Sequence, residues 1–209
     1  MVLDKQRDNM DPLLTRMARH FTFVHPNVLS FLSLIFAILA AMFFYFSTAG
    51  NYFLYFASLF VFVNGFFDAI DGKVAKLTNT ASKKGDFLDH AIDRYADVFI
   101  VGGVALSIWC NPIIGFFAIV GMLLTSYMGT QAQAIGHKRE YSGLLGRADR
   151  IVLLIFFPVV QQILLHYGYG KIFSFYLLEI MLIYFAIVGN ITAIQRFYST
   201  MKWFKNKSN

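Results

Sequence analysis

The sequence predicts an all-α polytopic membrane protein in which six transmembrane helices form one bundle. Its 209 residues are 57% hydrophobic and 18% aromatic, and only 14% are charged, whereas soluble proteins average about 25% charged residues. Apolar runs of about 20 residues, enough to cross roughly 30 Å of hydrocarbon, recur along the chain. Basic residues gather in alternate connections between these runs. Together these observations exclude an ordinary soluble domain.

Residues 1–26 are expected to be an N-terminal cytoplasmic segment that carries an amphipathic interfacial helix. Asp11 suits the N-cap position and Pro12 the first helical position. The segment lacks a short apolar stretch followed by a cleavage site of small residues, so we expect the first hydrophobic helix to remain in the protein. The helix separates into two faces, Leu13, Leu14, Met17 and Phe21 on one and Arg16, Arg19 and His20 on the other.

Residues 27–196 are expected to form the six-helix transmembrane domain, followed by a basic cytoplasmic tail over 197–209. The connections near Gly50, near Asn111 and across 168–170 are short, so consecutive helices should be antiparallel neighbours. The predicted spans are residues 27–48, 51–74, 86–109, 112–134, 147–167 and 172–195.

The distribution of basic residues predicts the topology. Of the 18 lysines and arginines, all except Lys171 fall on one side of the predicted membrane or in the adjoining helix halves. By the positive-inside rule, both termini and the connections that follow the second and fourth spans face the cytoplasm. A basic excess of this kind indicates contact with anionic lipid and no nucleic-acid partner. We therefore expect an integral protein of the cell membrane.

The second and third spans carry carboxylates that hydrophobicity does not explain. The apolar run from Val98 to Trp109 is only about 18 Å long at about 1.5 Å per residue, so the third span must begin near Asp86 or Asp89. An ionised aspartate at the centre of a membrane helix costs about 3 kcal/mol, so such residues usually mark a functional site. The carboxylates are Asp68, Asp71, Asp86, Asp89, Asp93 and Asp97.

Their spacing predicts a site for divalent cations. Asp68 and Asp71 are three residues apart and Asp89 and Asp93 four apart, so each pair shares one helical face. Oxygen ligands favour Mg²⁺ or Mn²⁺, and four carboxylates suffice for two ions. The single cysteine, Cys110, excludes a cysteine-based zinc site. The alternative is ion pairing between helices, for which the sequence offers Arg94 as the one nearby cation.

A family resemblance follows from residues 68–93, which read DAIDGKVAKLTNTASKKGDFLDHAID. The segment resembles the pattern D-x2-D-G-x2-A-R-x8-G-x3-D-x3-D of the CDP-alcohol phosphotransferase family, except that Lys76 replaces the arginine. The six-span layout is also similar to that family. The resemblance therefore implies a catalytic domain over 27–196 and an active site that faces the cytoplasm.

The resemblance implies transfer of a phospholipid group from a CDP-lipid to an alcohol by a homodimeric enzyme, with release of CMP. In that reaction Asp93 would be the general base and would also contact a metal. Lys76 would face the nucleotide, although a lysine offers a point charge in place of a planar fork. The implied metal ligands are Asp68, Asp71, Asp89 and Asp93, and the small residues beside the CDP group are Gly72, Ala75 and Gly85. Gly72 could alternatively end a helix and Gly85 could shape a turn.

The connection after the fourth span reads GHKREYSGLLGRADR and carries four basic residues, Lys138, Arg139, Arg147 and Arg150. Paired arginines suit a phosphate dianion, although they could equally be positive-inside anchors. With SYMGTQAQAIG before it, this stretch most resembles the archaetidylinositol phosphate synthases of the family. That resemblance implies inositol 1-phosphate as acceptor and CDP-archaeol as donor.

Two other functions stay open at this stage. Glycerol 3-phosphate is a second phosphorylated acceptor that the same basic residues could hold. A divalent-cation transporter would also use intramembrane carboxylates, but it would need polar residues that continue to the outer face, where the second and third spans are almost wholly apolar. Glu179 in the sixth span has no partner that the sequence indicates.

Overall fold

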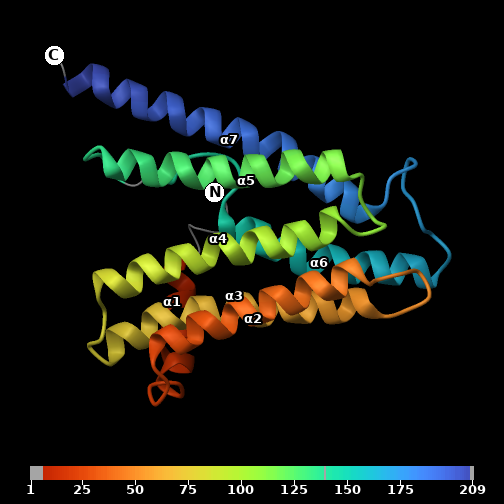
Figure 1. Ribbon diagram of the computed structural model, residues 1–209, viewed down its shortest axis with the longest axis horizontal. Coiled ribbons are helices and arrows are strands. Elements are labelled where there is room, and N and C mark those ends of the chain that lie inside the picture. The colour runs from red at the N-terminus through yellow and green to blue at the C-terminus, as the bar shows by residue number, and fades with distance from the viewer. Residues whose placement is uncertain (1–6, 139, 208–209) are drawn as a thin grey trace.

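The computed structural model describes residues 7–138 and 140–207, and within these ranges the chain forms seven α-helices (Figure 1). An isolated antiparallel bridge between Ile172 and Phe175 precedes the last helix. The helices are α1 (Arg7–Arg19), α2 (Pro26–Tyr45), α3 (Phe53–Leu77), α4 (Lys83–Ala105), α5 (Pro112–Ala134), α6 (Arg147–His166) and α7 (Leu177–Lys207).

Local capping residues decide where several helices begin. Prolines occupy the first turns of α2 and α5, where the missing N–H costs nothing. Ser82 accepts a hydrogen bond from the Gly85 N–H at the start of α4, and Asn111 accepts one from the Ile113 N–H at the start of α5. Also at the start of α5, Glu179 accepts a hydrogen bond of 2.9 Å from the Asn111 N–H. Glu179 therefore joins the beginnings of α5 and α7, a role that the sequence did not indicate.

Among the described residues, five helices (α2, α3, α5, α6 and α7) are long and apolar enough to cross a membrane. The helix expected at 86–109 appears as α4, which begins at Lys83 and ends at Ala105. Its first half carries the charges of Asp86, Asp89, Asp93 and Arg94, so its composition alone does not qualify it as a span. The chain is thus an all-helical membrane protein in which α4 is the exceptional helix.

Both ends of the described chain differ from expectation. Helix α1 begins at Arg7, so Asp11 is not its N-cap and Pro12 lies inside the helix. Asp11 instead pairs with Lys73 of α3. Helix α7 begins at Leu177 and not at 172, because residues 172–175 form a tight turn closed by two backbone hydrogen bonds. It then continues to Lys207, so the expected boundary at 196/197 falls inside a helix.

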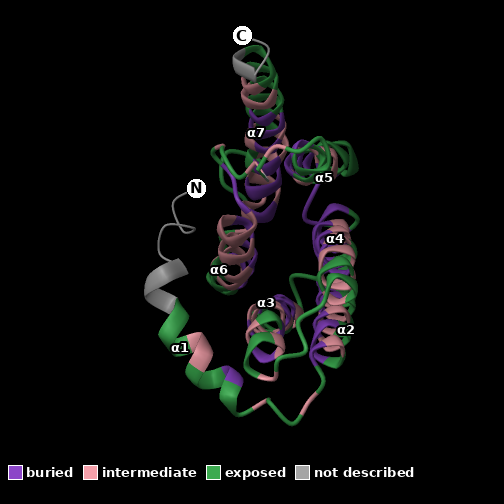
Figure 2. Cartoon of the chain, turned by 90° about the vertical axis from the view of Figure 1, so that its left-hand side faces the viewer, coloured by how far each residue is buried: buried purple, intermediate pink, exposed green. Residues whose placement is uncertain are grey.

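The apolar face of α1 is divided between protein and surroundings. Ala18 is buried with Leu29, Ile70 and Val74, and Phe21 packs against this cluster. Leu14 of the same helix also packs against this cluster, whereas Leu13 and Met17 are exposed. Helix α1 thereby lies along the outside of the bundle, against α3 (Figure 2).

The tightest helix pairs are α5 with α7, α2 with α3 and α2 with α4. The three helix pairs joined by the short connections, α2 with α3, α4 with α5 and α6 with α7, are in contact as expected, whereas α3 and α4 contact each other little. Helix α2 packs against both, and α6 packs against α3 on one side and α7 on the other. In Figure 2 the buried residues of these helices are coloured purple, and many of them lie on the sides that face neighbouring helices. The arrangement leaves the carboxylate-bearing ends of α3 and α4 free to face a shared volume.

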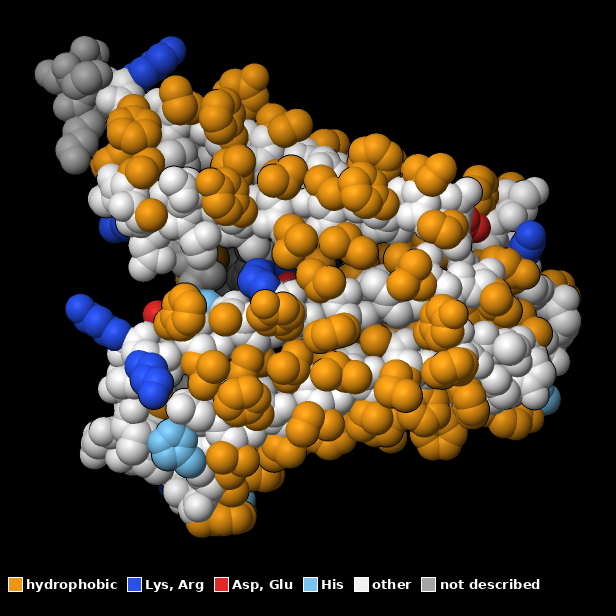
Figure 3. Space-filling view, in the orientation of Figure 1, with side chains coloured by type: hydrophobic (Ala, Val, Ile, Leu, Met, Phe, Trp, Pro, Cys, Tyr) orange, Lys and Arg blue, Asp and Glu red, His pale blue; other side chains and the backbone are white. Residues whose placement is uncertain are grey.

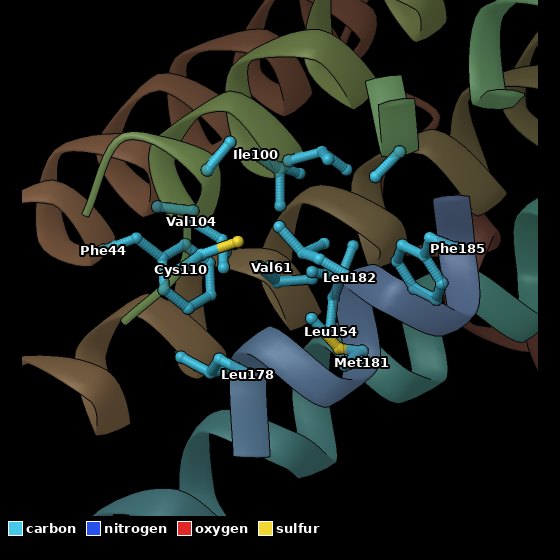
Figure 4. Close-up of a cluster of buried hydrophobic side chains, with 14 of the residues drawn as sticks. Phe44, Val61, Ile100, Val104, Cys110, Leu154, Leu178, Met181, Leu182 and Phe185 are labelled. Atoms are coloured by element: carbon cyan, nitrogen blue, oxygen red, sulfur yellow. The ribbon is translucent and has the colours of Figure 1, made fainter. Parts of the chain in front are cut away.

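A single large apolar cluster holds the helices together (Figure 4). It includes Phe44 of α2, Leu154 of α6 and Phe185 of α7. Glycines permit the closest approaches, as small residues do between membrane helices. A Cβ atom on Gly103 of α4 would lie only 2.5 Å from the Ala41 Cα of α2. The backbones of α2 and α4 are therefore in direct contact.

The adjacent glycine provides a test of this contact. Gly103→Ala should destabilise the protein by about 1–3 kcal/mol, because backbone atoms of α2 must move to accommodate the new methyl group. Gly102→Ala is the matched control, since a Cβ there meets nothing within 4 Å, and it should leave stability unchanged or slightly raised. Thermal unfolding in detergent measures both variants. Equal unfolding midpoints would contradict the direct α2–α4 contact.

Candidate active site

The structure brings the four expected metal ligands into one volume between α3 and α4. The carboxyl groups of Asp68 and Asp93 lie within hydrogen-bonding range of each other. Asp71 is close enough to Asp89 and to Asp68 for electrostatic interaction. Side-chain atoms of Asp89, Asp93 and the intervening His90 lie within 4.8 Å of one another. The two carboxylate pairs therefore converge across the gap between the helices.

Helix α2 fixes one of these carboxylates from the side. The Ser30 hydroxyl donates a hydrogen bond of 2.6 Å to Asp71 Oδ2, and the Gly72 N–H donates to Asp71 Oδ1. Asp71 is only 4% exposed. Its side chain is thus oriented by donors on α2 and α3 before any ligand arrives, which is the preorganisation that a metal ligand needs.

Arginines from distant parts of the chain neutralise the cluster. Arg147 Nη1 lies 2.7 Å from Asp68 Oδ2 and 2.8 Å from Asp93 Oδ1. Arg94 Nη2 lies 3.6 Å from Asp93 Oδ2 and 3.5 Å from Asp97 Oδ2, and Arg150 Nη2 lies 3.4 Å from Asp97 Oδ2. The expectation that Arg94 is the one nearby cation is therefore wrong. The sequence placed Arg147 and Arg150 beside a phosphate and did not predict their contact with the aspartates.

The donor set fits a divalent cation. It consists of carboxylate oxygens, the ligands that hard ions such as Mg²⁺ and Mn²⁺ prefer. Asp93 Oδ1 is buried and makes no hydrogen bond, although Arg147 lies close to it. Four acidic groups at this density repel one another unless cations lie among them. Asp68, Asp71, Asp89 and Asp93 are accordingly the residues that could hold metal.

Two of the positions expected beside the nucleotide, Gly72 and Lys76, are open, whereas a Cβ on Gly85 would lie 3.3 Å from the Ser82 hydroxyl oxygen. Gly72 is exposed, and a Cβ built on it would meet nothing within 4 Å. Lys76 is also exposed and Ala75 is half-buried. Gly72 lies inside α3 and Gly85 in the first turn of α4, so neither ends a helix nor forms a turn. Small side chains at these places leave room for a ligand to approach the backbone.

The expected acceptor residues separate into two groups. Arg147 and Arg150 lie in the first turn of α6 and reach the aspartates. Lys138 is exposed on the α5–α6 connection, and Arg139 lies outside the described residues. Figure 3 shows the molecular surface hollowed at its left-hand end, between α5 above and α4 below, with basic and acidic side chains at the hollow. Most Lys and Arg side chains visible on this face gather at that end.

A further arginine, Arg196 of α7, belongs to the same region. It is 5% exposed, and its guanidinium donates to the Thr125 carbonyl at 2.7 Å and to the Ser142 carbonyl at 2.9 Å. Arg94, Arg147 and Arg196 all lie close enough to Arg150 to repel it electrostatically. From the sequence, Arg196 was expected only to contribute to the positive charge of the cytoplasmic side. Its position at the end of an otherwise apolar span was the signal that could have singled it out.

Residues 23–195 match the family model for CDP-alcohol phosphatidyltransferase, which is more than three quarters of the chain. The chain belongs to the CDP-alcohol phosphatidyltransferase family. This membership makes the protein a transferase of phospholipid biosynthesis and an integral membrane protein, and it replaces the transporter alternative.

Curated relatives in this family include inositol-phosphate enzymes. The chain is 30% identical to the archaetidylinositol phosphate synthase of Pyrococcus horikoshii over 179 residues, which are 86% of this chain and 85% of that one. It is also 30% identical to the phosphatidylinositol phosphate synthase of Streptomyces avermitilis over 138 residues, which are 62% of this chain and 54% of the relative.

Solved structures share the fold. The phosphatidylinositol phosphate synthase of Mycobacterium tuberculosis with bound CDP-DAG has a TM-score of 0.71 at 21% identity, covering 90% of this chain and 94% of that one. The same enzyme in complex with manganese and citrate has a TM-score of 0.70 and covers 90% and 88% of the two chains. This CDP-alcohol phosphatidyltransferase therefore has the helical arrangement of that enzyme.

The arginine–aspartate contacts predict a stability change. Arg147→Met should destabilise the enzyme by about 3 kcal/mol in the presence of a chelator, because it leaves Asp68 and Asp93 without their closest cation. Adding Mn²⁺ should reduce the loss, since the ion supplies the missing charge. Thermal unfolding measures both effects. Lys73→Met is the control: its partner Asp11 is 52% exposed, so it should cost less than about 1 kcal/mol. If Arg147→Met lowered the free energy of unfolding no more than Lys73→Met does, Arg147 would not be the cation that compensates Asp68 and Asp93.

Proposed function

We propose that this enzyme transfers the phospholipid group from CDP-archaeol to inositol 1-phosphate and releases CMP, with two divalent cations, Mg²⁺ or Mn²⁺. The observation that carries the proposal is the contact of Arg147 with both Asp68 and Asp93. This contact brings two groups of side chains together. The arginines suit the phosphate of an acceptor, and the carboxylates suit metal binding and the role of general base.

The donor side is assigned to the carboxylates and the open backbone beside them. Asp68, Asp71, Asp89 and Asp93 hold the metal ions, which when bound neutralise the pyrophosphate and the departing CMP. Asp93 accepts the proton of the acceptor hydroxyl as that oxygen attacks the phosphorus next to the lipid. The CDP group lies along a surface of small side chains, and Lys76 offers it one positive charge. That surface consists of Gly72, Ala75 and Gly85.

The acceptor side is assigned to arginines of α6 and α7. Arg147, Arg150 and Arg196 bind the acceptor phosphate through charge-assisted hydrogen bonds, and the exposed Lys138 attracts it from the α5–α6 connection. Arg139, which lies outside the described residues, is assigned to the same phosphate from the sequence alone. Because Arg147 contacts Asp93 at 2.8 Å, a phosphate held there places the hydroxyl of the same small molecule near the base. The similarity to an archaetidylinositol phosphate synthase supports inositol phosphate as that molecule.

The proposed placement in the membrane follows from charge. Helix α4 also crosses the membrane, which brings the number of spans to six, with its carboxylates at the cytoplasmic side of the cell membrane, and α1 lies in the interface. Most Lys and Arg side chains visible in Figure 3 lie at the hollowed end of the molecule, and by the positive-inside rule this supports a cytoplasmic position for that end. Residues 1–26 form the cytoplasmic segment, 27–196 the catalytic domain and 197–209 its basic extension. The functional unit is a homodimer.

A comparison of reaction rates with different acceptors tests the proposed substrate. Purified enzyme with a CDP-lipid and Mn²⁺ should form CMP when inositol 1-phosphate is added, and mass spectrometry should detect the corresponding lipid product. Unphosphorylated inositol should support at most about one hundredth of that rate, because the arginines then lack their anion. Turnover with glycerol 3-phosphate and none with inositol 1-phosphate would show that the proposed acceptor is wrong.

The base assignment predicts a second outcome. Asp93→Asn should lower kcat at least about 100-fold, because an amide cannot accept the acceptor's proton. Asp86→Asn is the matched control from the same helix: its side chain is 74% exposed and contacts His90, so kcat should stay within about twofold of the unsubstituted enzyme. CMP release measures both variants. Activity in Asp93→Asn close to that of the control would refute the assigned role.

A further inference from the structure

The α5–α6 connection is fastened to the end of α7 by one carboxylate, Glu140. Glu140 Oε1 accepts a hydrogen bond of 2.9 Å from the Ser142 N–H, and Oε2 accepts one of 2.8 Å from the Ser199 hydroxyl of α7. His137 Nε2 lies 3.9 Å from Oε2, and its ring stacks on Trp203 at 4.7 Å between centroids. Glu140 is therefore bound from both the connection and α7.

The contacts continue from Glu140 to the arginine group. Ser142, whose N–H is held by Glu140, presents its carbonyl oxygen to Arg196 Nε at 2.9 Å. The Thr125 carbonyl of α5 accepts from Arg196 Nη1 at 2.7 Å. Two carbonyls thus fix the plane of this guanidinium, one in a regular helix and one in an irregular connection. Only the second depends on how that connection is held.

Arg196 benefits from such support because Arg150, a side chain of the same charge, lies close to it. It lies with Arg94 and Arg147 around Arg150, and like charges at low dielectric repel. An arginine side chain that is not fixed would lose about 2 kcal/mol of rotamer freedom on binding a ligand. The two carbonyl acceptors orient the Arg196 guanidinium and add no negative charge of their own.

We propose that Glu140 is a positioning residue of the acceptor site: it orders Ser142, whose carbonyl aims Arg196 at the acceptor phosphate. The inference rests on the proposed function, which places that phosphate among the arginines of α6 and α7. Glu140 itself contacts no substrate and acts through Ser142.

The protonation state of Glu140 agrees with this role. Partial burial raises its pKa, but the hydrogen bonds from Ser142 and Ser199 outweigh burial and leave the pKa below the usual range. The carboxylate stays ionised at neutral pH and can accept from both donors at once. The backbone of the α5–α6 connection also packs closely against α5 at Gly129. A Cβ on Gly129 would lie 2.9 Å from the Glu140 carbonyl oxygen and 3.0 Å from Arg196 Nη1.

Two substitutions at Glu140 separate positioning from charge. Glu140→Ala removes both hydrogen bonds and should raise KM for inositol 1-phosphate about tenfold, with kcat and KM for the CDP-lipid within about twofold of the unsubstituted enzyme. Glu140→Gln keeps an oxygen that accepts from the Ser142 N–H and an NH₂ that donates to Ser199, so its KM should rise less than about threefold. Isothermal titration with inorganic phosphate should show the same order of affinities without turnover.

A pair of hydroxyl variants on α7 gives a matched control. Ser199→Ala removes one of the two partners of Glu140 and should raise KM for the acceptor about threefold. Thr200→Ala removes a hydroxyl that donates to the backbone carbonyl of Arg196 at 3.0 Å, within the same helix and away from the guanidinium, and should leave KM unchanged.

The outcomes distinguish this inference from the proposed function. If Glu140→Ala and Glu140→Gln both bind phosphate as the unsubstituted enzyme does, or if Glu140→Ala lowers kcat and raises both KM values alike, Glu140 does not position Arg196. If the unsubstituted enzyme transfers to no inositol phosphate, the proposed function fails. The phosphate titration then still decides the role of Glu140.

Discussion

The structure depends on compensating the negative charge of several buried carboxylates. Asp71, Asp93 and Asp97 are each less than a tenth exposed, and an ionised aspartate in that setting must be compensated by a nearby positive charge. Three arginines from two helices meet this requirement: Arg94 of α4 and Arg147 and Arg150 of α6 all lie close to the carboxylates. The same electrostatic demand supports the proposal that the cluster binds divalent cations.

This demand also accounts for the unusual packing of α3 and α4. They follow each other in the chain yet barely touch, and α2 packs against both. Ser30 of α2 orients Asp71, while the direct contact of α2 with Gly103 fixes α4. Apolar packing thus supports a polar gap between two helices. Arg147 closes the gap from the α6 side, where it links the carboxylates to the arginines of the proposed acceptor site.

Much of this arrangement could be predicted from the sequence, since periodicity and spacing are local properties. The helices, and the shared faces of Asp68 with Asp71 and of Asp89 with Asp93, followed from hydropathy and the 3.6-residue repeat. Contacts between distant segments did not follow. Arg147 meets Asp68 across 79 residues, and nothing local to either residue specifies that pairing. Arg196 and Glu140 were missed for the same reason, because their roles arise from the fold of the α5–α6 connection against α7.

The central claim is that the carboxylates of α3 and α4 together bind divalent cations. Mn²⁺ binding to the purified enzyme in detergent, followed by electron paramagnetic resonance, tests it most directly. The account predicts saturable binding that Mg²⁺ displaces and that Asp68→Asn combined with Asp89→Asn abolishes. Saturable binding of equal strength in the double variant, or no saturable binding in the unsubstituted enzyme, would contradict it.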